Sequence, residues 1–148
     1  MTRPVRPHFN QRIAQNQDRA RIRNLERRII AERFIPVVFD GVGNVLAPGV
    51  WGDVPVHFDG TILRWRLITL EAGDVQIDVW KTDYSGFPPT VADTITGSDV
   101  PAVSSGQKAE STALTGWTTA VSAGDILRFN IDSVTAITKA TLTLTLQA

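Results

Sequence analysis

The hydrophobic periodicity of this sequence changes at Pro36. From about Gln11 to Arg33 the chain has no Pro or Gly and consists of good helix formers, which predicts one long helix. After Pro36, apolar residues alternate with polar ones at period 2, which is typical of strands with one buried face. We therefore expect a helical segment in residues 1–34 and a separate β domain in residues 35–148.

The charge divides at nearly the same point. Residues 1–33 hold nine Arg and three acidic residues, a net charge of +6, whereas residues 34–148 hold six basic and twelve acidic residues, a net charge of −6. A basic arm can bind nucleic acid or dock on an acidic protein surface. Docking on protein is favoured over nucleic acid, because the arm has no Lys and its Arg residues are interleaved with an apolar stripe.

The first ten residues are expected to form an extended arm. Pro4 and Pro7 disfavour a helix there, because proline fixes φ and restricts the residue before it. Such an arm becomes ordered when it binds a partner, whereas a frayed tail is the alternative. The side chains expected to dock are two basic and two apolar ones, namely Arg3, Arg6, Val5 and Phe9.

An oligomerisation motif is predicted within the helix. Ile22, Leu25 and Ile29 have the i, i+3, i+7 spacing of one helical stripe, and Arg21 and Glu26 flank it. This stretch resembles the Arg-h-x-x-h-Glu trimerisation motif of short coiled coils, where h is aliphatic, and the resemblance implies a homotrimer. A solitary amphipathic helix packed on its own domain is the alternative. Two heptads are marginal in water, so a trimer would also need contacts between the domains that follow.

The alternating segments predict several short strands. Segments around residues 35–39 and 54–58 contain Pro36 and Pro55, which favours edge strands or extended segments that lie across another subunit. The longest run, residues 61–70, is expected to be a central strand with Ile62 and Arg64 on the same face. A tight turn at residues 71–74 would then make a hairpin with residues 75–80.

The rest of the domain is predicted to be loops and further strands. Residues 90–111 are expected to be a crossover loop, residues 113–120 a strand, and residues 126–132 and 138–147 two strands with one wet face each. The whole pattern predicts an all-β fold, a jelly-roll-like antiparallel β-sandwich preceded by an N-terminal α-helix that forms a short coiled coil.

Several short segments from about residue 60 onward carry a family resemblance. They are, in order, residues 78–81 (DVWK), 87–93 (FPPTVAD), 95–98 (ITGS), 114–118 (LTGWT), 124–125 (GD) and 129–133 (FNIDS). This part of the chain resembles a β-sandwich module of virion proteins of tailed bacteriophages, found in tail fibres, head fibres and minor structural proteins.

The resemblance implies a function in the virion. It implies a fibre, spike or decoration subunit that binds other virion proteins, of the capsid or the tail, through its N-terminal arm. The β-sandwich would then be displayed, with attachment to the host surface as its possible use. The shared segments are those of turns and core positions, so the resemblance supplies no catalytic residues.

The residues suited to catalysis or metal binding are few. The chain has no Cys and two His, His8 and His57, which do not form a cluster. Asp83, Asp93 and Asp99 lack the spacing of a calcium loop. No apolar run is long enough to span a membrane, and no phosphate-binding glycine motif occurs. We expect no catalytic residue, no metal site, no cofactor and no membrane partner.

A glycan is the predicted small ligand. Gln76, Asp78 and Trp80 fall on one face of a predicted strand, and an aromatic ring beside an amide and a carboxylate can hold a pyranose. The partner would be a host cell-surface glycan, unless this face packs against the second sheet or a neighbouring subunit. The other functions considered are a capsular polysaccharide depolymerase, with Asp74 and Asp78 as its two carboxylates, and a glycan-binding module of a cellular protein.

Overall fold

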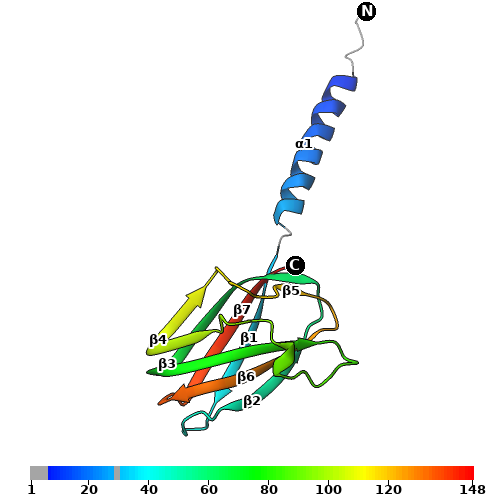
Figure 1. Cartoon of the computed structure of the whole chain (residues 1–148). Coiled ribbons are helices and arrows are strands. Elements are labelled where there is room, and N and C mark those ends of the chain that lie inside the picture. Colours follow the sequence, from blue (N-terminus) through cyan, green and yellow to red (C-terminus); the bar gives the residue numbers. More distant parts are fainter. Residues whose placement is uncertain (1–6, 29–30) are drawn as a thin grey trace, which may run out of the picture. The chain divides into compact units, whose positions relative to one another are not determined.

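The computed structural model describes residues 7–28 and 31–148, and within the helix it describes the side chains of residues 10–24. The chain divides into two compact units, Met1–Ala31 and Glu32–Ala148, which we call the helical unit and the β unit. The helical unit contains α1 (Pro7–Arg28) (Figure 1).

Helix α1 begins and ends earlier than predicted. It starts at Pro7, so the prediction of an extended arm through residue 10 is wrong for its last four residues. Proline is well suited to the first helical position, because its missing N–H would have no partner there. The predicted end at Arg33 is also wrong, because the helix ends at Arg28 and Glu32 already belongs to a strand.

The β unit consists of seven strands and one short 3-10 helix. They are β1 (Glu32–Asp40), β2 (Gly49–Pro55), β3 (Gly60–Thr82), η1 (Val91–Asp93), β4 (Ala102–Ser111), β5 (Ala120–Val121), β6 (Ile126–Thr135) and β7 (Lys139–Gln147). Every pairing is antiparallel, in the order β1-β7-β3-β6-β2, with β4 and β5 also paired to β3. The described part of the chain is mostly β, which confirms the predicted all-β class.

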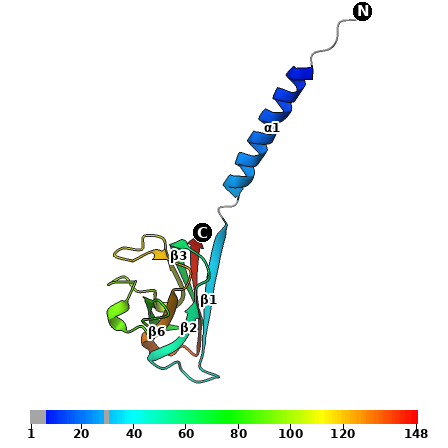
Figure 2. The same cartoon turned by 90° about the vertical axis from the view of Figure 1, so that its right-hand side faces the viewer.

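Strand β3 organises the sheet. Its first half pairs with β7 and its second half with β6, while β4 lies along its other edge. The predicted turn at residues 71–74 is wrong, because β3 runs unbroken through them for 23 residues. One bent strand thus links two halves of a curled sheet, and Figures 1 and 2 show this strand from two directions.

The bend in β3 has a local cause. At Gly73 a Cβ atom would overlap the backbone oxygen of Thr135 and contact the Ile137 side chain at 3.1 Å. Glycine therefore lets the turn between β6 and β7 approach β3 closely. Beside it, Glu71 accepts hydrogen bonds from Thr138 N at 2.8 Å and Thr138 Oγ1 at 2.5 Å, and these bonds lower the pKa of Glu71.

The proline-containing strands lie at the edges of the sheet, but the second was predicted around residues 54–58 and is found at Gly49–Pro55. β1, with Pro36, and β2, with Pro55, are the two ends of the strand order, which confirms the edge prediction. The predicted crossover loop of residues 90–111 is wrong in its second half, which is β4. The predicted strand of residues 113–120 is also wrong, since only Ala120 and Val121 pair with β3.

One core lies between the halves of the curled sheet. Phe39 of β1 packs edge-on against Trp51 of β2 and Phe129 of β6, at ring distances of 6.2 and 6.5 Å. Ile62 also lies in the core, although the sequence placed it on the face of Arg64. A register shift between Ile62 and Arg64 changes the alternation at that point.

We predict that Gly73→Ala lowers the free energy of unfolding by about 1–3 kcal/mol, because the added Cβ meets backbone that can move only by disturbing the sheet. Gly52→Ala in β2 is the matched control, since no heavy atom lies within 4 Å of the new Cβ, and we expect a change within about 0.5 kcal/mol. Urea denaturation followed by circular dichroism measures both. Equal effects of the two substitutions would contradict the close packing of Gly73 against Thr135 and Ile137.

Candidate functional site

Two outer surfaces of the β unit carry the candidate site residues. The first, which we call the polar face, is the outer side of β2, β6 and the second half of β3. It contains the predicted glycan-binding residues Gln76, Asp78 and Trp80, and Asn130 of β6 pairs with Asp78. Gln76 is exposed, Trp80 is half-buried and Asp78 is buried.

Asp78 is held by four hydrogen bonds from within the chain. Its Oδ1 accepts from Val79 N at 2.8 Å, Thr94 Oγ1 at 2.6 Å and Thr96 Oγ1 at 2.5 Å. Its Oδ2 accepts from Trp80 Nε1 at 2.7 Å. Oδ1 is therefore fully used, and the buried Oδ2 keeps one acceptor position, so most of the hydrogen-bonding capacity of Asp78 is taken up within the chain.

The bonds to Asp78 join β3 to the segment that follows η1. Thr94 makes an isolated bridge to Trp80, and Ile95 N donates to Val79 O at 2.9 Å. The segment after η1 therefore lies against the part of the polar face around Asp78. Glycan binding by Gln76, Asp78 and Trp80 stays a prediction, and Gln76 is the most accessible of the three.

The second carboxylate of the depolymerase alternative, Asp74, has a structural partner too. Its Oδ1 accepts from Ser105 N at 2.9 Å and Ser104 Oγ at 3.2 Å. Ser105 has a positive φ of 49°, so these bonds hold a backbone conformation that non-glycine residues seldom adopt.

Asp132 lies at a β-bulge on the polar face. The register of β6 shifts between Ser133 and Ile131, opposite Gln76 and Ile77. Partial burial raises the pKa of Asp132, and the nearby Asp78 carboxylate adds to this. The hydrogen bond from Asn130 Nδ2, at 2.7 Å, acts in the opposite direction.

Arg128 ties a loop to the polar face. It forms a two-pronged ion pair with Asp53, at 2.7 and 2.9 Å, which raises the pKa of Arg128. Its Nη1 donates to Pro89 O at 3.3 Å, and its guanidinium lies 5.2 Å from the ring centre of Phe87. The loop thus held exposes Tyr84, which is 86% accessible.

The Asp residues considered for calcium serve mainly as local caps. Asp83 accepts from Ser85 and Gly86, and Asp93 accepts from Thr90. Asp99 accepts through its backbone oxygen from the indole of Trp117. Within residues 7–28 and 31–148, no three His, Asp or Glu side chains are grouped as metal ligands.

The second surface, which we call the apolar face, was not predicted as a site. It is the outer side of β1, β7, the first half of β3 and β4. Four large apolar side chains stand exposed on it, Phe34, Val38, Ile68 and Leu70, with accessible fractions of 57–62%. The sequence places each of these residues on the side of its own strand opposite the core, but it does not show that they lie on neighbouring strands.

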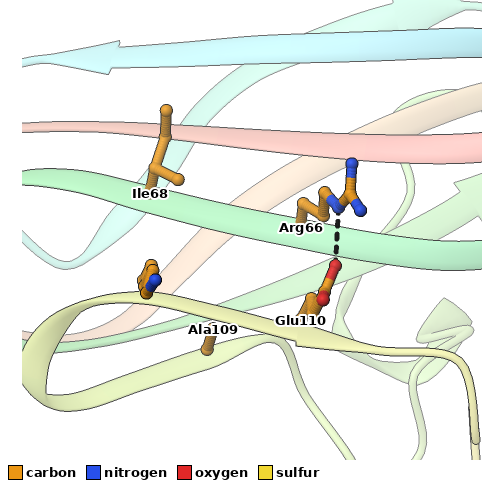
Figure 3. Close-up of a pocket in the computed structure, with 5 residues that line it drawn as sticks. Arg66, Ile68, Ala109 and Glu110 are labelled. Atoms are coloured by element: carbon orange, nitrogen blue, oxygen red, sulfur yellow. Dashed lines mark hydrogen bonds and ion pairs between the residues drawn. The ribbon is translucent and has the colours of Figure 1, made fainter.

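Two shallow grooves lie on the apolar face. The larger, about 420 Å³, is lined by Arg66, Ile68, Lys108, Ala109 and Glu110 (Figure 3). The smaller, about 210 Å³, is bordered by Ile68 and Leu70 of β3 and by residues of β7. Ile68 lines both grooves, so the two form one continuous surface.

Ion pairs within the chain neutralise much of the apolar face. Arg66 Nε lies 2.6 Å from Glu110 Oε2, and Figure 3 shows this pair crossing from β3 to β4. A second pair joins Lys139 and Asp40 at 2.9 Å. These exposed ion pairs contribute little to the stability of the β unit, but they leave few unpaired charges on the apolar face.

The predicted oligomerisation and docking residues are described only in part. Arg21 and Ile22 are exposed residues of α1. Leu25, Glu26 and Phe9 lie on α1, with side chains outside the described part of the structure. The remaining predicted residues, Ile29, Arg3, Val5 and Arg6, lie outside the described residues.

No family model matches the chain, and no curated protein or solved structure is similar enough to it to count as a match. Among the described residues, no helix is both long enough and apolar enough to cross a membrane.

We predict that Asp78→Ala destabilises the β unit by about 2–4 kcal/mol, because it leaves the hydroxyls of Thr94 and Thr96 and the Trp80 indole N–H without their acceptor. Gln76→Ala is the control on the same face, and we expect less than about 0.5 kcal/mol for this exposed side chain. Chemical denaturation measures both. A mild effect of Asp78→Ala would show that Asp78 is not the tie between β3 and the segment after η1.

Proposed function

We propose that this chain is a structural, non-enzymatic subunit of a tailed-bacteriophage virion, a fibre, spike or decoration protein. Its N-terminal region anchors it to other virion proteins of the capsid or tail, and its β unit is displayed. The observation that carries the proposal is the solvent exposure of the side chains of α1. Every helix side chain that the structure describes, residues 10–24, is exposed, including Ile13 and Ile22 at 43% and 52%.

An exposed helix with aliphatic residues is suited to assembly. Most helices in proteins gain their stability by packing an apolar stripe against something else. The stripe that begins at Ile22, flanked by Arg21, matches the short trimerisation motif, which supports a homotrimer with α1 at its centre. The net charge of +6 in residues 1–33 supports docking of the arm on an acidic protein surface.

The finer fold assignment belongs to the same proposal. We take the curled sheet to be a jelly-roll-like sandwich of the kind found in the virion module that the sequence resembles. Support comes from the two halves of the sheet, which share one core through Phe39 of β1 and Phe129 of β6. A closed sandwich on a short anchor is a suitable form for a displayed particle component.

The proposal of a virion protein has a direct test. If the chain is a particle component, mass spectrometry of purified phage particles from cells that express it detects the chain in stoichiometric amounts after density-gradient centrifugation. Its absence from intact particles, with the chain present only in the lysate, would overturn the proposal. A chain that digests capsular polysaccharide would instead support the depolymerase alternative.

The proposal of a trimer makes a second prediction. Light scattering of the full chain at micromolar concentration should give three times its mass of 16.2 kDa. Ile22→Lys should give a monomer, because it places a charge in the apolar seam. Ile13→Lys is the matched control, since Ile13 lies nine residues earlier, about 180° around the helix, and should leave the trimer intact. A wild-type monomer, or equal effects of both substitutions, would contradict the seam.

A further inference from the structure

We infer that the apolar face is an interface between copies of this chain, by which three β units contact one another around the axis of the α1 trimer. The inference rests on the proposed trimer and deepens it, because it names the surface that the short helical seam requires as its second contact. β1 follows α1 directly in the chain, so we place β1 nearest to the axis.

The apolar face has the shape of a surface that packs against another protein, with rows of large apolar side chains separated by short ones. Phe34 and Val38 form one apolar row on β1, and Ile68 and Leu70 form another on β3. Between the rows, the outer side of β7 carries only short side chains, the half-buried Thr141 and Thr143 and the buried Thr145, which pair with β1 and β3. An exposed apolar surface of this regularity marks an interaction site more often than an ordinary surface does.

The other large exposed apolar side chains of the β unit are placed differently. They lie in loops, in η1 or at the start of edge strand β2, and they do not form rows across neighbouring strands. They are Val42, Val45, Val50, Tyr84, Phe87 and Val91. The apolar face is therefore the better candidate for a broad contact.

The charge distribution favours a second copy of this chain as the partner that binds the apolar face. The β unit, residues 32–148, holds thirteen acidic and seven basic residues, so two β units repel each other over most of their surface. The apolar face carries four of the seven basic residues and three of the thirteen acidic ones. These seven residues are Arg64, Arg66, Lys108, Lys139, Glu32, Asp40 and Glu110. With a net charge of +1 there and −7 elsewhere, this surface meets an acidic copy with the least repulsion.

The basic groups of the apolar face do not demand a foreign acidic ligand. Arg66 and Lys139 are paired within the chain, and Arg64 lies 4.0 Å from Glu32. With most of its charges paired, the apolar face suits a copy of this chain, whereas the basic N-terminal arm would find no excess of acidic groups there.

The short connection between α1 and β1 allows a weak contact between the apolar faces to hold the β units together. Only residues 29–31 separate α1 from β1, so the start of β1 lies within about 14 Å of the last helical residue even when the connection is fully extended. Helix axes in a bundle are about 8–10 Å apart. Three β1 strands are thus kept near one another, at an effective concentration on the order of millimolar.

Single cysteines test the interface cleanly, because the chain has none of its own. Three variants of the full chain are oxidised mildly and run on a non-reducing gel: Val38→Cys on the apolar face, Ile22→Cys in the helix, and Val50→Cys on β2 at the opposite end of the strand order. We expect cross-linked pairs from Val38→Cys and Ile22→Cys, formed at least about tenfold faster than from Val50→Cys, because a disulfide requires close Cα atoms.

The outcomes separate the two proposals. Cross-linking at Ile22 with none at Val38 above the Val50 rate would overturn the interface and leave the trimer standing. Failure at both Ile22 and Val38, with a monomeric mass, would overturn both. Cross-linking at Val38 alone would overturn the helical seam, and with it the arrangement of the apolar face around a helical axis.

A second pair of variants tests the face without cysteine. Ile68→Lys places a charge where both grooves meet, whereas Val50→Lys makes the same change in β2. With circular dichroism confirming that both fold, Ile68→Lys should raise the concentration at which the trimer dissociates by at least about tenfold, and Val50→Lys should not. Unchanged assembly of Ile68→Lys would overturn the interface.

Discussion

The close approach of Gly73 in β3 to Thr135 and Ile137 is the constraint on which the β unit depends. Because glycine has no side chain there, β3 bends without ending, and one strand pairs with β7 in its first half and with β6 in its second. Glu71 fixes the same place by binding both the backbone and the hydroxyl of Thr138. The bend encloses the core on one side and turns the apolar face outward on the other.

Asp78 shows how a polar residue on such a strand can be structural. Its carboxylate lies beneath the segment after η1 and collects two threonine hydroxyls, an indole N–H and a backbone N–H. Burial of a charged group is costly unless its bonding is satisfied, and here four donors satisfy it. Alternation along β3 correctly indicates that Asp78 points away from the core, but it carries no information on what covers that side.

Local patterns predicted the elements whose pairing obeys simple alternation. β6 and β7 were visible from alternating apolar residues, and Pro36 and Pro55 marked the two edge strands. β4 was missed, because its sequence is mostly small and polar and its strand state comes from pairing with β3. The bend at Gly73 was predicted as a turn, because Gly followed by Asp is a common turn signal. A bent strand differs from a turn here only through the close contact of Gly73 with Thr135, which is far away in the sequence.

Of the two proposed contact surfaces, the helical seam could be predicted from the sequence and the apolar face could not. The helical seam could be predicted because its spacing lies within one short segment around Ile22. The apolar face could not, since Phe34, Val38, Ile68 and Leu70 become neighbours only after β7, from the far end of the chain, inserts between β1 and β3. A surface made by strand order is invisible to periodicity, which reports only which side of its own strand a residue occupies.

The energetics explain why the proposed assembly would use both surfaces. Fully burying one large apolar side chain contributes about 1.5–3 kcal/mol, and the four on the apolar face are already about two-fifths covered. Burying the rest contributes on the order of 4–7 kcal/mol per copy, which is comparable to the lost translational and rotational freedom of association, about 4–15 kcal/mol. The face alone is therefore marginal, and a two-heptad helix alone is also marginal. Residues 29–31 join the helix to the β unit, so the helical seam and the apolar face together cost the translational and rotational freedom of association only once. The helix can then set the number of copies, while the apolar face supplies the stability.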